Sequence, residues 1–227
     1  MTLKRILDWL DRELETGKFD DVSNNGLQVD GPANVDKVAF AVDASLESVK
    51  AAVACGAQLL VVHHGISWGG GVRRITGGVY NVVKAAIDGG VAIAAYHLPL
   101  DASRRYGNNH ELARFLGLRR LKPAFSYRGS LIGVTGFNTH GVKIGVCSGG
   151  AGDFAEEARN LGCGLYVTGE ATWGDVVAAG NCGMKMVCAG HYATETFGVK
   201  ALARAMKARL KVGTEFLPRK AVAGMEA

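Results

Sequence analysis

The chain has 227 residues, of which 48% are hydrophobic and 21% are charged, and its formal net charge is +5. This length allows one large domain or two small intertwined ones around a buried core. No apolar run approaches the roughly 18 residues of a membrane span, and so mild a charge does not by itself indicate nucleic acid.

The first residues predict an amphipathic helix. Leu3, Ile6, Leu10 and Leu14 recur at helical spacing and are interrupted by charged residues. A secretory signal has a continuous apolar segment, so this start is not typical of one. The five cysteines form no C-x-x-C pair, and we interpret them as reduced thiols. We therefore expect a cytoplasmic protein.

Short apolar strands alternate with helices along the rest of the chain. The expected strands are 38–42, 59–62, 91–96, 143–147, 165–168 and 184–189, and the expected helices are 46–57, 79–88, 109–116, 154–160 and 194–210. Ser45 is placed to cap the first of these helices, and Gly117 to close the third. The alternation predicts an α/β fold with mixed, mostly parallel sheets that helices cover.

The second half of the chain resembles the first. Segments that begin KVAFAVD and VKIGVCS each run through a strand, a loop, a helix, a glycine, a strand, a polar motif and a Trp-Gly pair. Each half later reaches a His-x-x-x-acid motif. This order predicts an internal duplication. We expect two related α/β lobes, about 1–125 and 126–227, with their motifs around one shared cleft.

Polar motifs directly follow four of the expected strands. They are His63-His64, His97 with Asp101, Gly169-Glu170, and Gly190-His191 with Glu195. In open α/β sheets, ligands bind beyond the carboxyl ends of the strands. These motifs are therefore the candidates for a functional site.

Histidine and carboxylate together suit divalent metals of intermediate softness. His63 and His64 are adjacent at a strand end and diverge, so they serve two ions better than one. His191 and Glu195 share a helix face, and the two oxygens of Glu195 are suited to bridging. Either pair alone also occurs in ordinary cores and surfaces, so their combination is what predicts metal. We predict two divalent ions, of Zn, Fe or Mn, held by His63, His64, Asp101, His191 and Glu195.

Other side chains are candidates for catalysis and substrate binding. His97 is the candidate proton shuttle, since an unperturbed histidine titrates near ~6.5. The doublets Arg73-Arg74 and Arg104-Arg105 either hold an anionic substrate or are solvated surface.

Four further polar positions have two interpretations or a weaker signal. Asn25 and Gln28 either bring amides to the site or belong to a turn that leads into a strand. Asp43 either orients a ligand histidine or caps a loop. Glu170 is a further candidate substrate contact. His110 and His140 lack such surroundings, and we expect both at the surface.

Several motifs together resemble the Nif-three-like dinuclear metal proteins, often labelled GTP cyclohydrolase 1 type 2 homologues. They are NNGLQVDG, VVHHGISWG, YHLPLDA, GNN, TGE and GHYATE, within about residues 3–217. The resemblance implies two related α/β lobes, a two-metal site at the five predicted ligands with Glu195 as the bridge, and homohexameric rings. His97 matches a further histidine beside the family's site. Val177 stands where the family has a histidine on the helix after TGE.

Three classes of function remain. The first is a hydrolase that acts on a small phosphate- or nucleotide-like substrate through a metal-activated water. The alternative is a hexameric ring scaffold or DNA-associated protein with structural metals, although no basic stretch is interleaved with aromatic residues. A metal chaperone or sensor is disfavoured by the absence of paired cysteines.

Overall fold

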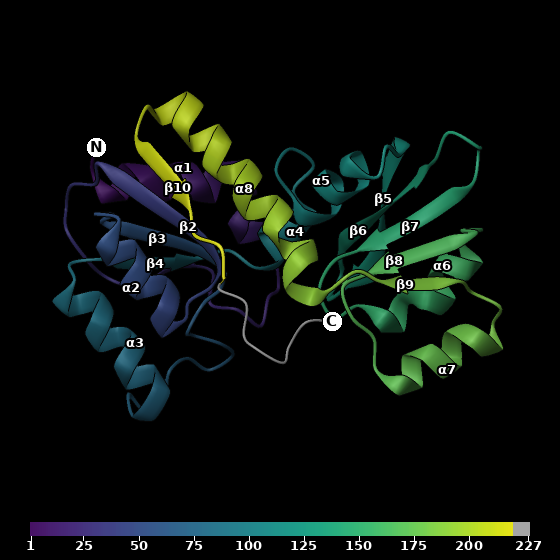
Figure 1. The fold of residues 1–227 in the computed structure, drawn as a ribbon, viewed down its shortest axis with the longest axis horizontal. Helices are drawn as coiled ribbons and strands as arrows, with labels where there is room; N and C mark the ends of the chain where they lie inside the picture. The colour runs from purple at the N-terminus through teal and green to yellow at the C-terminus, as the bar shows by residue number, and fades with distance from the viewer. Residues whose placement is uncertain (220–227) are drawn as a thin grey trace. The chain divides into compact units, whose positions relative to one another are not determined.

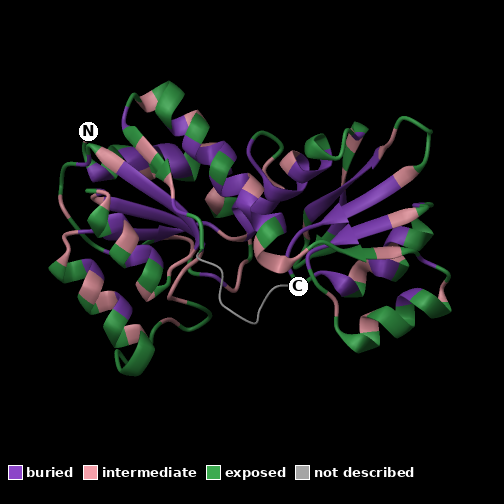
Figure 2. Ribbon diagram, in the orientation of Figure 1, coloured by how far each residue is buried: buried purple, intermediate pink, exposed green. Residues whose placement is uncertain are grey.

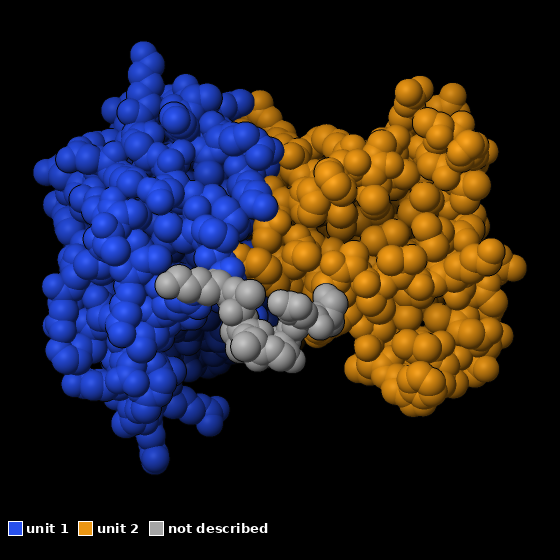
Figure 3. Space-filling view, in the orientation of Figure 1, with its two compact units in different colours: residues 1–99, 199–227 blue, residues 100–198 orange. Residues whose placement is uncertain are grey.

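The computed structural model describes residues 1–219, which form two compact units. Unit 1 contains residues 1–99 and those from 199 onward, and unit 2 contains residues 100–198 (Figure 3). The expected lobe boundary near residue 125 therefore does not coincide with the division between the units. Residues 119–127, before that boundary, pair with the sheet of unit 2, and the C-terminal strand joins the sheet of unit 1. Residues 220–227, at the end of the expected second lobe, lie outside the described residues.

Unit 1 is built on a five-stranded sheet with the order β1-β4-β3-β2-β10. The strands are β1 (Gly26–Val29), β2 (Lys37–Asp43), β3 (Leu59–His64), β4 (Ala92–Ala95) and β10 (Gly213–Phe216). The last four are parallel, and β1 pairs antiparallel with β4. β1 confirms that the segment around Asn25 and Gln28 leads into a strand. β10 was not expected, because its residues are partly exposed and carry little apolar signal.

Helices cover this sheet (Figure 1). They are α1 (Leu3–Leu14), α2 (Leu46–Ala54) and α3 (Gly77–Asp88), with a short 3₁₀ turn at Thr16–Lys18. The four predicted apolar positions of α1 are all buried. Ser45 caps α2 as predicted: its hydroxyl accepts from the Ser48 amide at 3.0 Å, and the Ser48 hydroxyl accepts from the Ser45 amide at 2.9 Å. The expected helix ran to 57, but α2 ends at Ala54, ahead of Gly56 with its φ of 75°.

Unit 2 has a second five-stranded sheet, in the order β5-β6-β7-β8-β9. The strands are β5 (Arg119–Tyr127), β6 (Ser130–Phe137), β7 (Lys143–Cys147), β8 (Leu165–Thr168) and β9 (Met186–Cys188). β7, β8 and β9 are parallel, whereas β5, β6 and β7 are antiparallel. Sequence reasoning missed the β5–β6 hairpin. Its two-residue turn, Arg128-Gly129, has positive φ at both positions, as a type I′ turn requires.

The remaining helices are short except the last. They are α4 (Leu98–Ala102), α5 (Asn108–Phe115), α6 (Ala155–Asn160), preceded by a 3₁₀ turn at Gly152–Phe154, α7 (Trp173–Asn181) and α8 (His191–Leu210). α8 begins in unit 2 and ends in unit 1. It starts three residues before the expected Thr194, so His191 opens the helix. Gly117, with a φ of 70°, follows α5 as predicted.

The two units share one topology. β2-α2-β3-α3-β4 in unit 1 corresponds to β7-α6-β8-α7-β9 in unit 2, and in both the three strands are parallel neighbours. The inner strands of both sheets are mostly buried and the outer helix faces are exposed (Figure 2). Two related α/β lobes with mixed sheets are therefore confirmed. Among the described residues, none of the helices is long and apolar enough to cross a membrane.

The surface prediction for His110 is wrong, whereas His140 is exposed as expected. His110 lies on the buried face of α5 with only 5% of its surface exposed, and its Nδ1 has no hydrogen-bond partner in the described part of the chain. Burial, together with the charges of Arg114 and Arg104, lowers the pKa of His110 from 6.5 to about 4. The histidine is therefore buried in its neutral form at physiological pH.

Acidification should destabilise the fold through His110. Because the unfolded chain takes up this proton near pH 6.5 and the folded chain only near pH 4, the free energy of unfolding falls as the pH drops through that window. We expect a loss of about 2–3 kcal/mol in wild type and a clearly smaller loss in His110→Leu. Urea unfolding of EDTA-treated protein at several pH values measures it. His140→Ala is the control, and a His110→Leu curve parallel to wild type would contradict this assignment.

Candidate metal centre

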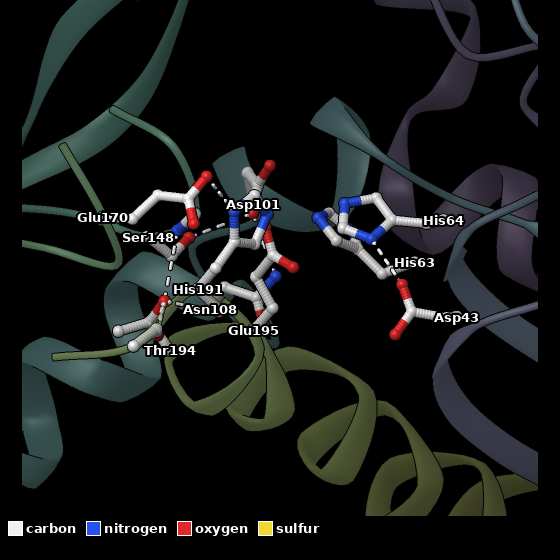
Figure 4. A network of polar contacts seen from close by, with 12 residues as sticks. Asp43, His63, His64, Asp101, Asn108, Ser148, Glu170, His191, Thr194 and Glu195 are labelled. Carbon is white, nitrogen blue, oxygen red and sulfur yellow. Dashed lines mark hydrogen bonds and ion pairs between the residues drawn. The ribbon is translucent and has the colours of Figure 1, made fainter. Parts of the chain in front are cut away.

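The end of β3 in unit 1 places two histidines side by side. The four residues before them are apolar and buried, as in a strand that is packed on both faces. This packing fixes the strand up to His63 and His64 at its end. His63 Nδ1 lies 3.0 Å from the carbonyl oxygen of Tyr96, just after β4. His64 Nδ1 lies 2.9 Å from Asp43 Oδ1, and Asp43 is its register partner on β2 (Figure 4). Neighbouring parallel strands thus orient both imidazoles.

A third histidine, His97, follows β4 and is oriented by Asp21. Its Nδ1 lies 2.9 Å from Asp21 Oδ1. The side chain of Asp21 is 1% exposed. Burial opposes ionisation of this carboxyl, but hydrogen bonds from His97, Asn25 and Ser23 outweigh it and lower its pKa to about 2. Sequence reasoning missed Asp21; the available signal was its place just ahead of the predicted polar loop.

The three histidines converge. One ring nitrogen from each of His63, His64 and His97 lies within 4.8 Å of the other two. The ring centroids are 4.6 Å apart for His63 and His64, 5.0 Å for His63 and His97, and 5.7 Å for His64 and His97. Imidazole nitrogens bind a divalent ion at about 2.0–2.1 Å, so such a group can hold one. Unit 1 alone therefore presents a nitrogen-rich cluster.

Unit 2 carries a histidine held by carboxylates. At the start of α8, His191 Nε2 lies 3.1 Å from Glu195 Oε1, and His191 Nδ1 lies 3.0 Å from Glu170 Oε1 (Figure 4). Glu195 is buried. Its hydrogen bond, aided by Glu170 and opposed by burial, raises the pKa of His191 to about 9. Without a metal ion His191 is therefore cationic at neutral pH, and an incoming cation replaces its proton.

Asp101 lies in α4 and is also buried. Its Oδ1 accepts hydrogen bonds from Asn108 Nδ2 at 2.9 Å and from Ser148 Oγ at 3.3 Å. Asn109 in turn accepts from the Ser148 amide at 2.6 Å. Sequence reasoning did not single out these asparagines as site residues, although the GNN motif contains them. They fix a carboxylate that was predicted as a ligand.

Gly149, beyond the end of β7, leaves space for this cluster. Its φ is +68°, and a Cβ there would lie 2.5 Å from Glu195 Oε1. Its amide donates to Thr194 Oγ1 at 3.1 Å. Any side chain at this position would both strain the backbone and collide with the buried carboxylate.

The amides predicted to contact substrate hold loops together. Gln28 Oε1 accepts from the amides of Ile66 at 2.7 Å and Ser67 at 3.1 Å. Asn25 Oδ1 accepts from the His97 amide at 2.8 Å, and its Nδ2 donates to Asp21 at 2.9 Å. Both therefore position the segments that carry the histidines, and their contact with substrate stays a prediction.

The predicted basic doublets are exposed. Arg73 and Arg74 lie in the loop between β3 and α3, in unit 1. Arg104 and Arg105 follow α4 in unit 2, where the Arg105 guanidinium lies 5.9 Å from the centre of the Tyr106 ring. Substrate binding by these four arginines stays a prediction.

Known proteins are similar to this chain in sequence and in fold. A family model described as Duf34/NIF3 (NGG1p interacting factor 3) matches residues 1–139 and 129–221. A Pyrococcus horikoshii protein named GTP cyclohydrolase 1 type 2 homolog is 37% identical over 246 residues, covering 96% of this chain and 98% of the relative. A protein of the same name from Archaeoglobus fulgidus is also 37% identical, with the same coverage. The solved structure of TTHA1606 from Thermus thermophilus superimposes with a TM-score of 0.86 at 30% identity, covering 99% of this chain and 100% of that one.

Removing the acceptor behind His64 should weaken metal binding. Asp43→Ala leaves the imidazole in place but frees its tautomer and orientation, so we expect a roughly 10- to 100-fold loss of Zn²⁺ affinity. Competition with a chromogenic chelator measures it. Asp36→Ala, an exposed carboxylate just before the opposite end of β2, is the matched control. Equal affinities in the two variants would show that Asp43 has no role in orienting a ligand.

Proposed function

The chain belongs to the Duf34/NIF3 family, and from this premise we propose that it is a metal-dependent hydrolase with two divalent ions. Their ligands are His63, His64, Asp101, His191 and Glu195. The set combines donors from both units, and that combination is part of the proposal.

One observation carries the metal assignment. All four histidines of the two clusters have Nδ1 beside a fixed oxygen: those of Tyr96, Asp43, Asp21 and Glu170, at 2.9–3.0 Å. Metal-binding histidines characteristically use one ring nitrogen in this way, because the outer oxygen fixes the tautomer and aims the other nitrogen at the ion. His110, a buried histidine outside the two clusters, has no such partner at Nδ1 among the described residues.

The donor chemistry agrees with divalent transition metals. Unit 1 contributes imidazoles, and unit 2 contributes two buried carboxylates with His191. Burial of Asp101 and Glu195 is costly unless cations are near, so bound ions offset that cost. Imidazole with carboxylate suits Zn, Mn and Fe alike, and the choice among them depends on supply as well as on affinity.

Bound metals would supply a Lewis acid for a substrate oxygen and would lower the pKa of water towards ~7. The protein's own side chains would then transfer protons and orient the catalytic histidine. We propose that His97 exchanges protons with the reacting groups. The ionised Asp21 holds the His97 ring and stabilises positive charge on it, as a carboxylate does behind a catalytic histidine.

The substrate class follows from charge. Four exposed arginines follow the ligand motifs, at Arg73, Arg74, Arg104 and Arg105, and suit a small phosphate- or nucleotide-bearing molecule. The cyclohydrolase name of the relatives corresponds to one such substrate, a purine nucleotide. We propose the wider class for this chain. No observation on the described residues favours the DNA-associated alternative over it.

We also propose that the chain assembles into a homohexamer. In support, unit 2 exposes apolar side chains on α7 and the edge strand β9: Trp173 is 79% exposed, Val177 44% and Val187 47%. Surfaces of this kind commonly mark protein contacts.

Light scattering should give about six times the 23.9 kDa chain mass, and Val187→Lys should lower the measured mass. A monomeric wild type would refute the assembly.

Loss of a predicted ligand should remove metal and leave the fold. After anaerobic reconstitution we expect about two ions per chain in wild type, and a clear loss in Glu195→Ala and His64→Ala. Elemental analysis measures the content, and circular dichroism checks the fold. Glu156→Ala, an exposed carboxylate on α6, is the control. Full metal in both ligand variants, or none in wild type, would overturn the proposal.

A further inference from the structure

A half-exposed tryptophan lies beside the histidines of unit 1. Trp68 exposes 38% of its surface, although it is the largest apolar side chain near the cluster. Its ring meets His97 edge-on, with centroids 5.2 Å apart and planes at 74°, and lies 6.0 Å from His64. An exposed indole in contact with candidate ligands offers a planar apolar surface that the fold itself does not cover.

The indole is held in one orientation. Trp68 Nε1 donates to the Gly65 carbonyl at 2.9 Å. The backbone of Trp68 bridges to Ser23, and the next amide, that of Gly69, donates to Val22 at 2.6 Å. Because the ring is fixed at both its nitrogen and its backbone, a ligand that stacks on it loses little side-chain freedom.

The loop under the ring is equally constrained. The carboxamide oxygen of Gln28 accepts from two consecutive amides of this loop, those of Ile66 and Ser67. At Gly65 an added Cβ would lie 2.2 Å from that same oxygen, so the loop packs against Gln28 too closely for any other residue. The arrangement therefore preorganises the loop that carries Trp68, and it explains why Gln28 has a positioning role.

We propose that Trp68 is a stacking platform for the planar heterocycle of a phosphate-bearing ligand. This subsite rests on the proposed function, because it places the ring of the ligand next to the His63, His64 and His97 cluster. Arg73 and Arg74 follow Trp68 by five and six residues on the same exposed loop, and they offer cations to a phosphate. Every base has a π-face that can stack, so stacking alone does not select one base. The proposed ligand class is therefore any nucleotide-like heterocycle.

Two roles of Trp68, shielding and stacking, predict different effects of its removal. If Trp68 only shields the histidines from solvent, its loss should change metal affinity and leave ligand preference unaltered. If it stacks, its loss should abolish the preference for ligands that contain a ring. Ribose 5-phosphate is the appropriate reference, since it keeps the sugar and phosphate of a nucleotide and lacks the base.

The test is calorimetric binding of GMP, AMP and ribose 5-phosphate to the full chain, both Zn²⁺-loaded and EDTA-treated. We expect at least one nucleotide to bind wild type about 10-fold or more tightly than ribose 5-phosphate. Trp68→Ala should remove that difference while keeping Zn²⁺ content and ribose 5-phosphate affinity. Trp68→Phe should keep part of it. Phe115→Ala, which removes an aromatic ring that is 74% exposed at the C-terminal end of α5, should behave as wild type.

Two results would overturn the subsite: equal binding of the nucleotides and ribose 5-phosphate by wild type, or an undiminished preference in Trp68→Ala. Failure of the hydrolase proposal is recognised separately. A Trp68-dependent preference in protein that takes up no Zn²⁺ when it is loaded would support the platform and reject the metal centre. Full metal content with no such preference would do the reverse.

Discussion

The hydrogen bond from an imidazole Nδ1 to a fixed oxygen is the interaction on which the candidate site depends. It recurs at His63, His64, His97 and His191, and in each case a different element supplies the oxygen. A histidine without such a partner rotates and changes tautomer, so it offers no defined nitrogen to an ion. In unit 1 the neighbouring strands and the polar loop before β1 therefore orient the ring nitrogens, and in unit 2 the loop after β8 does so for His191.

The same constraint explains side chains that do no chemistry of their own. Asn25, just before β1, is joined to the segment that follows β4, and Gln28, within β1, is joined to the segment that follows β3. In unit 2, Asn108 and Gly149 have comparable roles around Asp101 and Glu195, one by donating to a carboxylate and the other by leaving room. Polar residues in both units thus orient the candidate ligand side chains, as a preorganised site requires.

The duplicated β-α-β-α-β topology gives each unit the same set of strand ends, and the two halves fill them differently. After β3 the chain places His63 and His64, whereas after β8 it places Gly169 and Glu170. Unit 1 is therefore rich in nitrogen donors and unit 2 in carboxylates. Divergence of two copies in this way gives each unit its own kind of ligand, and divalent metals of intermediate softness accept both imidazole and carboxylate.

The sequence by itself determined the parallel strands, the first and last helices and the five candidate ligands, because apolar periodicity and polar motifs at strand ends are local signals. Only the tertiary structure revealed Asp21 behind His97, the hairpin of β5 and β6, the return of β10 to unit 1, and the burial of His110. Each of these depends on contacts between segments distant in the chain. The segment that packs against a polar side chain decides whether that side chain is oriented, buried or exposed. A local sequence pattern does not identify this packing segment.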